Sequence, residues 1–396
     1  MNHTISHLQC VSCKKEYDVD ELEYTCPHCG PVKGTLDVIY DFRKVHKRLS
    51  KEKIAHSGNP GHWRYLPILP VVNPGFIQPL KVGWSPLYHF PVFNKKIGFP
   101  NLYLKDDSSN ITHSYKDRAS SVAIVKALER GYKGIAAASS GNAAASIAAF
   151  AASAGLPCHI FVPKTIPRGK LAQLKAYKAK VRLVDGSYDR AFDLCMREAP
   201  ENHWYNRNTA INPYLAEGKK TGALEICEQL NWRAPDVLLV PVGDGCIISG
   251  IWKGFKDFYD LGFIDTLPRL IGVQAQGSAP LVKAFGEGKK NADVQEVHTV
   301  ADSIAVGFPR DQVKALRAVH QSGGKFLAVS DHEILQAQKT LAAGSGVFVE
   351  PAAAAAFAGL LKLKAENKLG EEQTIVVLLT GSGLKDVEAI IGKSDH

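Results

Sequence analysis

Residues 101–118, NLYLKDDSSNITHSYKDR, place a lysine where an amine could act as a nucleophile and base. An apolar run at 102–104 predicts a strand, a polar loop follows at 106–110, and a helical pattern runs from about 114 to 130. Lys116 therefore falls in the first turn of the predicted helix, where the helix dipole disfavours its ammonium form. The neutral amine of a nucleophile is favoured at such a position. From this stretch alone, a solvated surface lysine remains the alternative.

Four cysteines near the N-terminus have the spacing of a metal site, C-x2-C-x12-C-x2-C. Each C-x2-C turn can bring two thiolates onto one ion, and two such pairs suit tetrahedral zinc in a closed, structural site. Two disulfides, which a reducing cytoplasm disfavours, and a ribbon that has lost its metal are the alternatives. The predicted zinc ligands are Cys10, Cys13, Cys26 and Cys29.

Three further loops each follow an apolar run and precede a helical pattern, the positions at which open α/β sheets bind ligands. The first, Ser139 to Asn142, suits a carboxylate, although a plain N-cap cluster is the alternative. Two glycines in the second, at 242–247, let the backbone approach an anion closely. It is neither a P-loop, which needs G-x4-G-K-[ST], nor a complete Rossmann fingerprint. The third loop covers residues 379–386.

The composition is that of an ordinary globular protein. The chain has 396 residues, of which 45% are hydrophobic and 22% charged, and this length predicts two lobes plus an appendage. The net charge of +9 has no basic block, so nucleic-acid binding has no support, and attraction of small phosphorylated anions explains the charge equally well. Neither a signal peptide nor a membrane-spanning apolar run is evident, which predicts a cytoplasmic protein.

Apolar runs and helical patterns alternate from residue 102 onward, which predicts an α/β fold of two lobes with parallel sheets around a central cleft. The expected strands are residues 102–104, 134–138, 159–162, 181–184, 237–242, 270–273 and 374–379, with helices at 142–154, 169–177, 188–198 and 213–230. The expected regions are a zinc-ribbon-like module (1–35), an irregular, proline-rich lead-in packing on the large lobe (36–100), a smaller lobe with the lysine (101–205) and a larger lobe with the glycine loop (206–396).

The run from Ser114 to Arg118, SYKDR, resembles the S-[FY]-K-D-R signature of the pyridoxal-phosphate (PLP) enzymes of fold type II. Similar motifs recur from about Trp63 to Asp386, and within that superfamily the chain most resembles the threonine synthases. The resemblance implies that Lys116 carries PLP as a Schiff base and moves protons at Cα and Cβ of the substrate. Some threonine synthases have an N-terminal zinc ribbon, which agrees with the four cysteines.

The same resemblance gives roles to the three loops. It implies that Ser139 and Ser140 bind the substrate carboxylate, that Asn142 hydrogen-bonds the PLP 3′-oxygen, and that Thr380 meets the pyridine nitrogen. The PLP phosphate is expected on Gly243, Asp244, Gly245, Cys246 and Ile247. Asp244 is unusual in a loop that binds an anion, because its carboxylate must turn away from the anion or cap the following helix.

The substrate segment departs from the family pattern. Asn208 and Thr209 match a family asparagine and hydroxyl that help bind the substrate phosphate. In the N-P-x-R-x-E-G-x-K-T motif that follows, Leu215 replaces the arginine, and Ala305 replaces that of I-R-I-G-N-P, a drift toward serine/threonine dehydratases. Without the guanidinium, another cation must bind the phosphate, or the substrate carries no phosphate. The candidates are Lys220, which is the first choice, then Arg207, and Lys219.

The resemblance implies the threonine synthase reaction, a PLP-dependent conversion of O-phosphohomoserine and water to threonine and phosphate by a carbon–oxygen lyase. The first alternative is another fold type II lyase acting on serine, threonine or phosphoserine by dehydration or β-replacement. The second is a PLP-binding or zinc-ribbon interaction protein without turnover. The expected partner is a small phosphorylated amino acid. Neither nucleic acid nor a membrane is expected, and a homodimer is compatible with the sequence.

Overall fold

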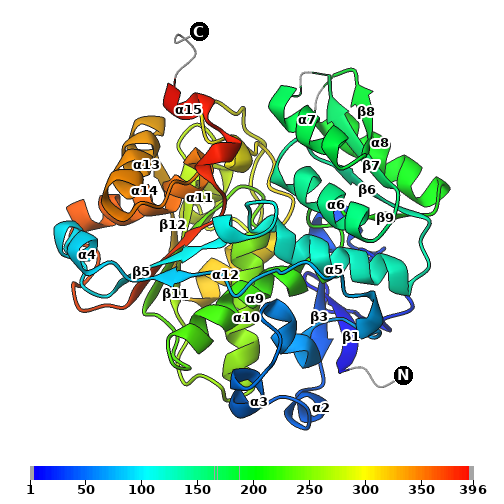
Figure 1. Cartoon of the computed structure of the whole chain (residues 1–396), viewed down its shortest axis with the longest axis horizontal. Coiled ribbons are helices and arrows are strands. Elements are labelled where there is room, and N and C mark those ends of the chain that lie inside the picture. The colour runs from blue at the N-terminus through cyan, green and yellow to red at the C-terminus, as the bar shows by residue number, and fades with distance from the viewer. Residues whose placement is uncertain (1–3, 165, 167, 187, 392–396) are drawn as a thin grey trace. The chain divides into compact units, whose positions relative to one another are not determined.

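The computed structural model describes residues 4–164, 166, 168–186 and 188–391, and it divides into two compact units (Figure 1). Unit 1 consists of Met1–Val82 and Lys116–Lys219, and unit 2 of Gly83–Tyr115 and Lys220–His396. Each unit is therefore assembled from two separate stretches of the chain. Among the described residues, no helix combines the length and apolar character that a membrane crossing requires.

The N-terminal part of unit 1 is a small antiparallel sheet with strand order β2-β1-β3. The turn between β1 and β2 carries the first cysteine pair, and the segment before α1 carries the second. The two helices that follow the sheet are short. The bounds are β1 (Ile5–Cys10), β2 (Glu16–Tyr17), α1 (Gly30–Lys33), β3 (Leu36–Tyr40), α2 (Phe42–His46) and α3 (Lys51–Ala55).

A four-stranded parallel sheet, in the order β8-β7-β6-β9, forms the centre of unit 1. Every residue of β6 is buried, because a parallel strand at this position is covered on both faces. One face packs on α5 and α6 and the other on α8, with successive β6 side chains alternating between them. The bounds are α5 (Lys116–Glu129), β6 (Gly134–Ala138), α6 (Asn142–Ser153), β7 (Cys158–Pro163), α7 (Arg168–Ala176), β8 (Lys180–Val184), α8 (Tyr188–Glu201) and β9 (Trp204–Asn206).

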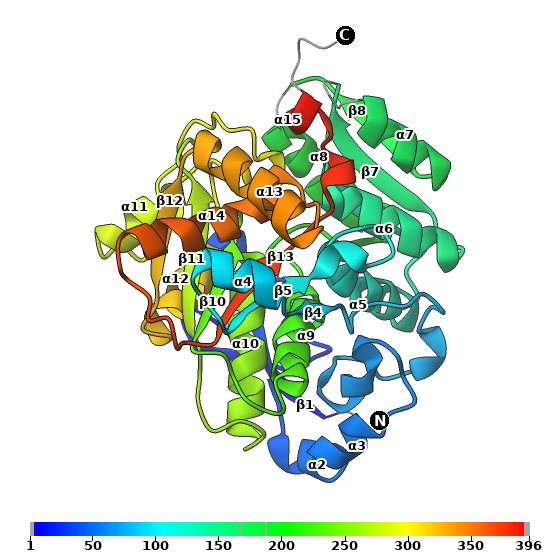
Figure 2. The same cartoon turned by 60° about the vertical axis from the view of Figure 1, so that its left-hand side comes forward.

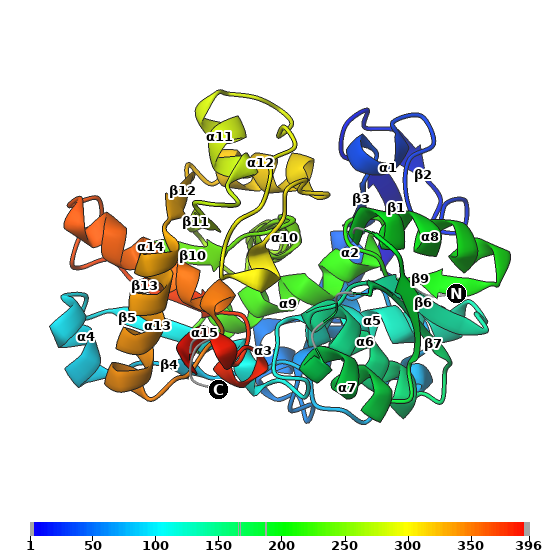
Figure 3. The same ribbon diagram turned by 90° about the horizontal axis from the view of Figure 1, so that it is seen from above.

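Unit 2 contains a six-stranded sheet in the order β12-β11-β10-β13-β5-β4, in which only β4 is antiparallel to its neighbour. The alanine-rich α14 lies along β10, β11, β12 and β13, and α13 packs against it (Figure 3). The edge formed by β5 and β4 can be followed in Figure 2. The strand bounds are β4 (Leu87–Tyr88), β5 (Leu102–Asp106), β10 (Val237–Pro241), β11 (Arg269–Ala275), β12 (Lys325–Val329) and β13 (Ile375–Leu379). The helices are α4 (Pro91–Ile97), α9 (Tyr214–Gln229, which begins in unit 1), α10 (Cys246–Asp260), α11 (Pro280–Gly286), α12 (Gln312–Gln321), α13 (Asp331–Ser345), α14 (Pro351–Ala365) and α15 (Glu388–Ile391).

The predicted α/β class with parallel sheets is confirmed, and each predicted strand and helix has a counterpart in the structure. The units divide the chain differently from the predicted regions. β5 was expected in the smaller lobe with the lysine, but it pairs with β13 of the larger sheet. Residues 36–82 were expected against the large lobe and belong to unit 1, because β3 pairs with β1 of the ribbon. These pairings join residues far apart in the chain, so local patterns do not reveal them.

Candidate active site and metal site

Lys116 lies in the first turn of α5, as predicted; it is the first residue of that helix and is partly exposed. The three residues before it belong to unit 2. His113 has a left-handed φ of 61°, which is uncommon for a residue other than glycine. The Tyr115 N–H donates to the Thr380 carbonyl at 2.8 Å, and Ser114 forms an isolated bridge with Gly381. The backbone leading to Lys116 is therefore fixed against the loop that carries Thr380.

Ser114 is the clearest sign that the segment before this lysine suits a polar ligand. Its hydroxyl is buried, at 1% exposure, and has no hydrogen-bond partner among the described residues. A buried polar group without a partner costs about 1–3 kcal/mol, so native proteins rarely keep one without a reason. A polar group bound two residues from Lys116 would satisfy it. The chemistry of this segment fits PLP, which combines a carbonyl for the amine with ring and phosphate oxygens.

The glycine loop between β10 and α10 requires its glycines. Gly245 is the N-cap of α10 with φ 91°, and a Cβ there would lie 2.6 Å from the Ala315 Cβ. A Cβ on Gly243 would meet Val306 Cγ2 at 3.0 Å. Within the described residues α10 has no side-chain cap hydrogen bond, and its first two residues are Cys246 and Ile247. Such a terminus favours a phosphate.

Asp244 turns away from the helix that follows it. Its Oδ1 accepts the Arg310 N–H at 3.1 Å, and its backbone carbonyl accepts the Asp311 N–H at 3.0 Å. The carboxylate thus stabilises the turn at residues 308–311, which removes the electrostatic objection to an acid in an anion loop. The predicted contribution of Asp244 to phosphate binding then rests on its backbone.

Within unit 1 the structure brings the two predicted substrate loops together. The Asn208 side chain is buried, and its Oδ1 accepts the Ala138 N–H at 2.7 Å, directly before Ser139 and Ser140. The Asn208 Nδ2 group has no hydrogen-bond partner among the described residues. It is therefore a preformed donor, as expected of a group that binds an anion.

The same two loops also contain partly exposed residues that a ligand can reach. Ser139 and Ser140 are partly exposed, and the Ser139 hydroxyl accepts the Gly141 N–H at 3.2 Å. In the described part of the chain, α6 begins at Asn142 with Gly141 as its N-cap and has no side-chain cap hydrogen bond. Thr209 is partly exposed and is followed by Ala210, which has a left-handed φ of 63°. Strained backbone of this kind clusters at ligand sites.

Lys220, the first choice for a phosphate-binding cation, is held elsewhere. Its Nζ lies 2.6 Å from Asp257 Oδ2, and the Lys220 side chain is completely buried. Burial alone would raise the pKa of Asp257, but Lys220 and Lys253 hold that pKa below its usual value. A buried ion pair is costly to break, so this contact disfavours a substrate role for Lys220.

Arg207 and Asn208 occupy opposite faces of the sheet in unit 1. Arg207 Nη2 lies 3.4 Å from Ser120 Oγ on α5, and the positive charge opposes the burial that raises the pKa of Cys158 to about 12. Asn208 lies on the α8 side, where its side chain opposes the burial that raises the pKa of the Cys195 thiol to about 12. Arg207 therefore extends toward the helix that begins with Lys116, and away from the Asn208 amide.

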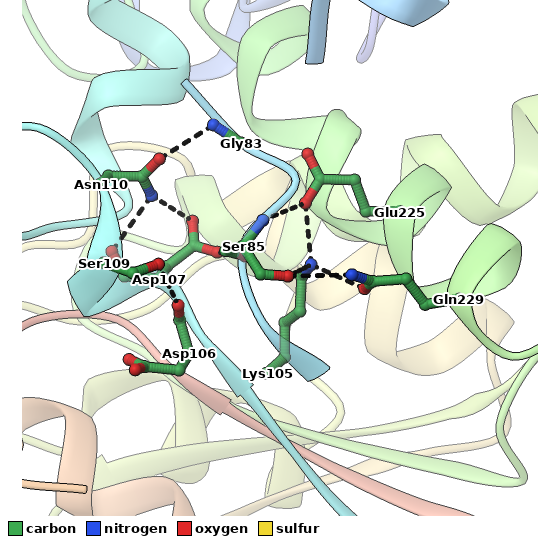
Figure 4. Close-up of polar contacts among 9 residues, drawn as sticks. All are labelled: Gly83, Ser85, Lys105, Asp106, Asp107, Ser109, Asn110, Glu225 and Gln229. Atoms are coloured by element: carbon green, nitrogen blue, oxygen red, sulfur yellow. Dashed lines mark hydrogen bonds and ion pairs between the residues drawn. The ribbon is translucent and has the colours of Figure 1, made fainter. Parts of the chain in front are cut away.

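The lysine of β5 has a structural role, shown in Figure 4. Lys105 is fully buried, and its Nζ donates to the Ser85 carbonyl at 2.7 Å, to Glu225 Oε2 at 2.8 Å and to Gln229 Oε1 at 2.9 Å. The Ser85 hydroxyl in turn donates to Asp107 Oδ1 at 2.5 Å. Three acceptors fix the ammonium, so Lys105 is not available to bind a cofactor covalently.

Sequence reasoning missed a buried carboxylate against the Thr380 loop. Glu350 is 3% exposed, and its N–H donates to the Gly381 carbonyl at 3.0 Å. Its Oε2 accepts the Ser303 hydroxyl at 3.2 Å, and a Cβ on Gly381 would lie 2.6 Å from Oε1. Gly381 is thus needed because this carboxylate packs on it. The only signal in the sequence is a Glu-Pro pair at the start of an alanine-rich helix.

The four predicted zinc ligands converge. The Sγ atoms of Cys10, Cys13, Cys26 and Cys29 all lie within 4.8 Å of one another. Zn–S bonds of about 2.3 Å in a tetrahedron need sulfurs roughly 3.8 Å apart, and Cys13 and Cys26 are separated by 3.8 Å. Burial opposes ionisation of Cys26, but hydrogen bonds from the Tyr17 hydroxyl, 3.0 Å away, and from backbone N–H groups lower the pKa of Cys26 to about 6. The donor set and its spacing fit a four-sulfur metal site.

Comparison with known proteins first defines the class. Residues 79–381 match the family described as "Pyridoxal-phosphate dependent enzyme", and the chain belongs to that family. Solved structures share the fold: maize serine racemase has a TM-score of 0.66 at 24% identity, covering 76% of this chain and 88% of that one. Threonine deaminase isoform 2 from Solanum lycopersicum has a TM-score of 0.64 at 22% identity, covering 77% and 85%. At these identities the likeness concerns the fold alone.

Relatives in sequence show to which group of PLP-dependent enzymes the chain belongs. The threonine synthase of Methanocaldococcus jannaschii is 44% identical over 390 residues, 98% of this chain and 95% of that protein. That of Methanosarcina acetivorans is 41% identical, covering 97% and 93%, and that of Mycobacterium tuberculosis 40%, covering 82% and 88%. Within the PLP-dependent enzymes, the chain belongs with the threonine synthases.

Replacing Lys105 with Met should lower the free energy of unfolding by about 3–5 kcal/mol, because Glu225 would remain buried without its counter-charge. The visible absorbance of bound PLP should persist. Denaturant unfolding and a visible spectrum measure the two effects. Lys256→Met is the matched control, since the Lys256–Asp260 pair is exposed and should contribute less than about 1 kcal/mol. A Lys105→Met protein of wild-type stability without PLP absorbance would show that Lys105, not Lys116, holds the cofactor.

Proposed function

We propose that this chain is a threonine synthase that converts O-phosphohomoserine and water to threonine and phosphate. The observation that supports it most is the 44% identity to a threonine synthase over 98% of the chain. The loops of unit 1 agree with it, because the Asn208 side chain joins the two predicted substrate segments. Incubation with O-phosphohomoserine should release threonine and phosphate in equal amounts. Faster deamination of threonine than its synthesis would instead support a dehydratase.

Each residue then has a defined task. PLP supplies an electron sink at the substrate's α-carbon when it is bound. Lys116 holds the cofactor and moves protons at Cα and Cβ, for which an amine at a helix start is suited. Ser139 and Ser140 bind the carboxylate of the substrate. Thr380 offers the pyridine nitrogen a hydroxyl, a neutral partner that leaves the ring a mild electron sink.

The substrate phosphate is recognised without the family arginine. Leu215, at that position, is 1% exposed and packs in the apolar cluster of unit 1, so it cannot contribute. We assign the phosphate to the Asn208 amide and the Thr209 hydroxyl, and we leave out Arg207, whose side chain extends toward Ser120 on α5. Lys220 is left out of this assignment because of its ion pair with Asp257.

Lys116→Ala should abolish both threonine synthesis and the visible absorbance of lysine-bound PLP. The fold should persist, because Lys116 is partly exposed at the start of α5. Absorbance spectra, circular dichroism and the O-phosphohomoserine assay measure these outcomes. Lys133→Ala, a lysine just beyond the same helix, is the control that should keep all three signals. An unchanged visible spectrum in Lys116→Ala would refute the assignment.

Asn208→Asp should keep the acceptor for the Ala138 N–H and replace the buried donor with a negative oxygen. Because a hydrogen bond to a charged group contributes about 1.5–3 kcal/mol, kcat/KM for O-phosphohomoserine should fall roughly 10- to 100-fold. Deamination of threonine, which carries no phosphate, should fall much less if it is measurable. An equal loss on both substrates, or none on either, would place the phosphate elsewhere.

We further propose that the four cysteines bind structural zinc. Fresh protein should contain about one zinc per chain, and replacing both Cys26 and Cys29 with Ser should remove it and lower the Tm, since metal binding contributes folding energy at closed sites. Cys158→Ala, which changes a buried thiol outside the cluster, should keep the metal. If wild-type protein contains no metal, and its Tm does not change when zinc is supplied, the ribbon has lost its metal.

A further inference from the structure

The connection between the two cysteine pairs is anchored on the α/β part of unit 1. Glu23 accepts hydrogen bonds from the Tyr132 hydroxyl and, at 3.3 Å, from Arg130 Nη1. Arg130 Nη2 also donates to the Val19 carbonyl at 2.9 Å and to the Tyr214 hydroxyl at 3.1 Å. The ribbon is thus attached through this connection to the end of α5 and the start of α9.

Tyr24, two residues before Cys26, continues this attachment into the sheet. Its hydroxyl accepts the Asn206 N–H at 2.9 Å, and its ring lies 6.0 Å from that of Tyr205. The ring packs against both apolar clusters of unit 1. Asn206 ends β9, an edge strand of three residues, and its N–H faces away from the neighbouring β6, to which the next N–H, that of Arg207, donates. The Tyr24 hydroxyl supplies the acceptor that a buried backbone N–H needs.

From Asn206 a chain of hydrogen bonds reaches both substrate loops. Asn206 Oδ1 accepts the Asn208 N–H at 2.8 Å, and Asn208 Oδ1 accepts the Ala138 N–H at 2.7 Å. Asn206 also accepts, through its carbonyl, the Asn212 amide at 3.0 Å. Tyr24 is therefore at one end of a continuous path whose other end is the backbone before Ser139.

We propose that Tyr24 is a positioning residue for substrate binding, and that the ribbon braces the two substrate loops of this lobe in addition to stabilising the fold. The proposal rests on the threonine synthase function and assigns a part of its substrate recognition. Tyr24 touches neither substrate nor cofactor, and it acts through Asn206 and Asn208. The contacts to the substrate's phosphate form when the substrate binds, before the phosphate leaves, so loosening this path raises KM more than it lowers kcat.

Tyr24→Phe removes the hydroxyl and keeps the ring. KM for O-phosphohomoserine should rise about three- to tenfold, as expected for one buried hydrogen bond, with kcat within about twofold of wild type. Metal content and the visible spectrum should not change. Amide hydrogen exchange should become faster in peptides covering residues 204–212 and 134–142. Asn206→Ala, which breaks the next link of the path, should show the same division between KM and kcat.

Tyr40→Phe is the matched control. Tyr40 is a buried tyrosine of the same unit, and its hydroxyl donates to Glu217 at 2.8 Å, off the path from Tyr24 to Ala138. Tyr40→Phe should lose about as much stability as Tyr24→Phe. Its KM for O-phosphohomoserine and its amide hydrogen exchange at residues 204–212 should not change. Unchanged KM and exchange in Tyr24→Phe, or equal effects in both variants, would overturn the brace. Wild-type protein that makes no threonine would instead overturn the proposed function, while the exchange measurements would still test the brace.

Discussion

The parallel pairing of β5 with β13 is the constraint on which the lysine-bearing segment depends. Its register places Asp106 opposite Leu379, so the chain leaves both strands at the same edge of the sheet. The loop that follows β5 then runs beside the loop that follows β13, and the Tyr115 N–H meets the Thr380 carbonyl. Two segments more than 250 residues apart in sequence are brought together by this one ladder. The pairing thus positions the backbone up to Tyr115, the residue directly before Lys116.

Buried charge distinguishes the lysines of this chain. Lys105 and Lys220 are completely buried, and each lies within 2.8 Å of a carboxylate oxygen, Glu225 or Asp257. Their ammonium groups are stabilised by those partners and serve the fold, since an unpaired charge would be far too costly in the interior. Lys116 differs from both because it begins a helix and is partly exposed. Position in the fold thus distinguishes Lys116, the proposed nucleophile, from these two structural cations.

Local patterns were sufficient for most of the fold and for the loops of the candidate site. Apolar runs located β6, β10 and β13, and the residues that follow them occupy strand ends as predicted. Pairings across the chain were beyond such reasoning. Nothing near Lys220 in sequence indicates that Asp257, 37 positions later, takes its ammonium. The contact between Tyr24 and Asn206 spans 182 positions and joins a side chain to a backbone N–H, which leaves no trace in a sequence motif.

The segment that lacks the family arginine is also the segment that the ribbon contacts. Leu215 packs in the apolar core of unit 1, so the proposed function assigns the substrate phosphate to neutral donors such as the Asn208 amide. The strength of a hydrogen bond from a neutral donor depends more on orientation than the attraction of a charged group does. Coulomb attraction acts over a longer range and in many directions. A site that relies on an amide therefore needs its backbone held more firmly than a site with a guanidinium. The hydrogen bonds that run from Tyr24 through Asn206 to Asn208 supply that rigidity at the segment where the arginine is missing.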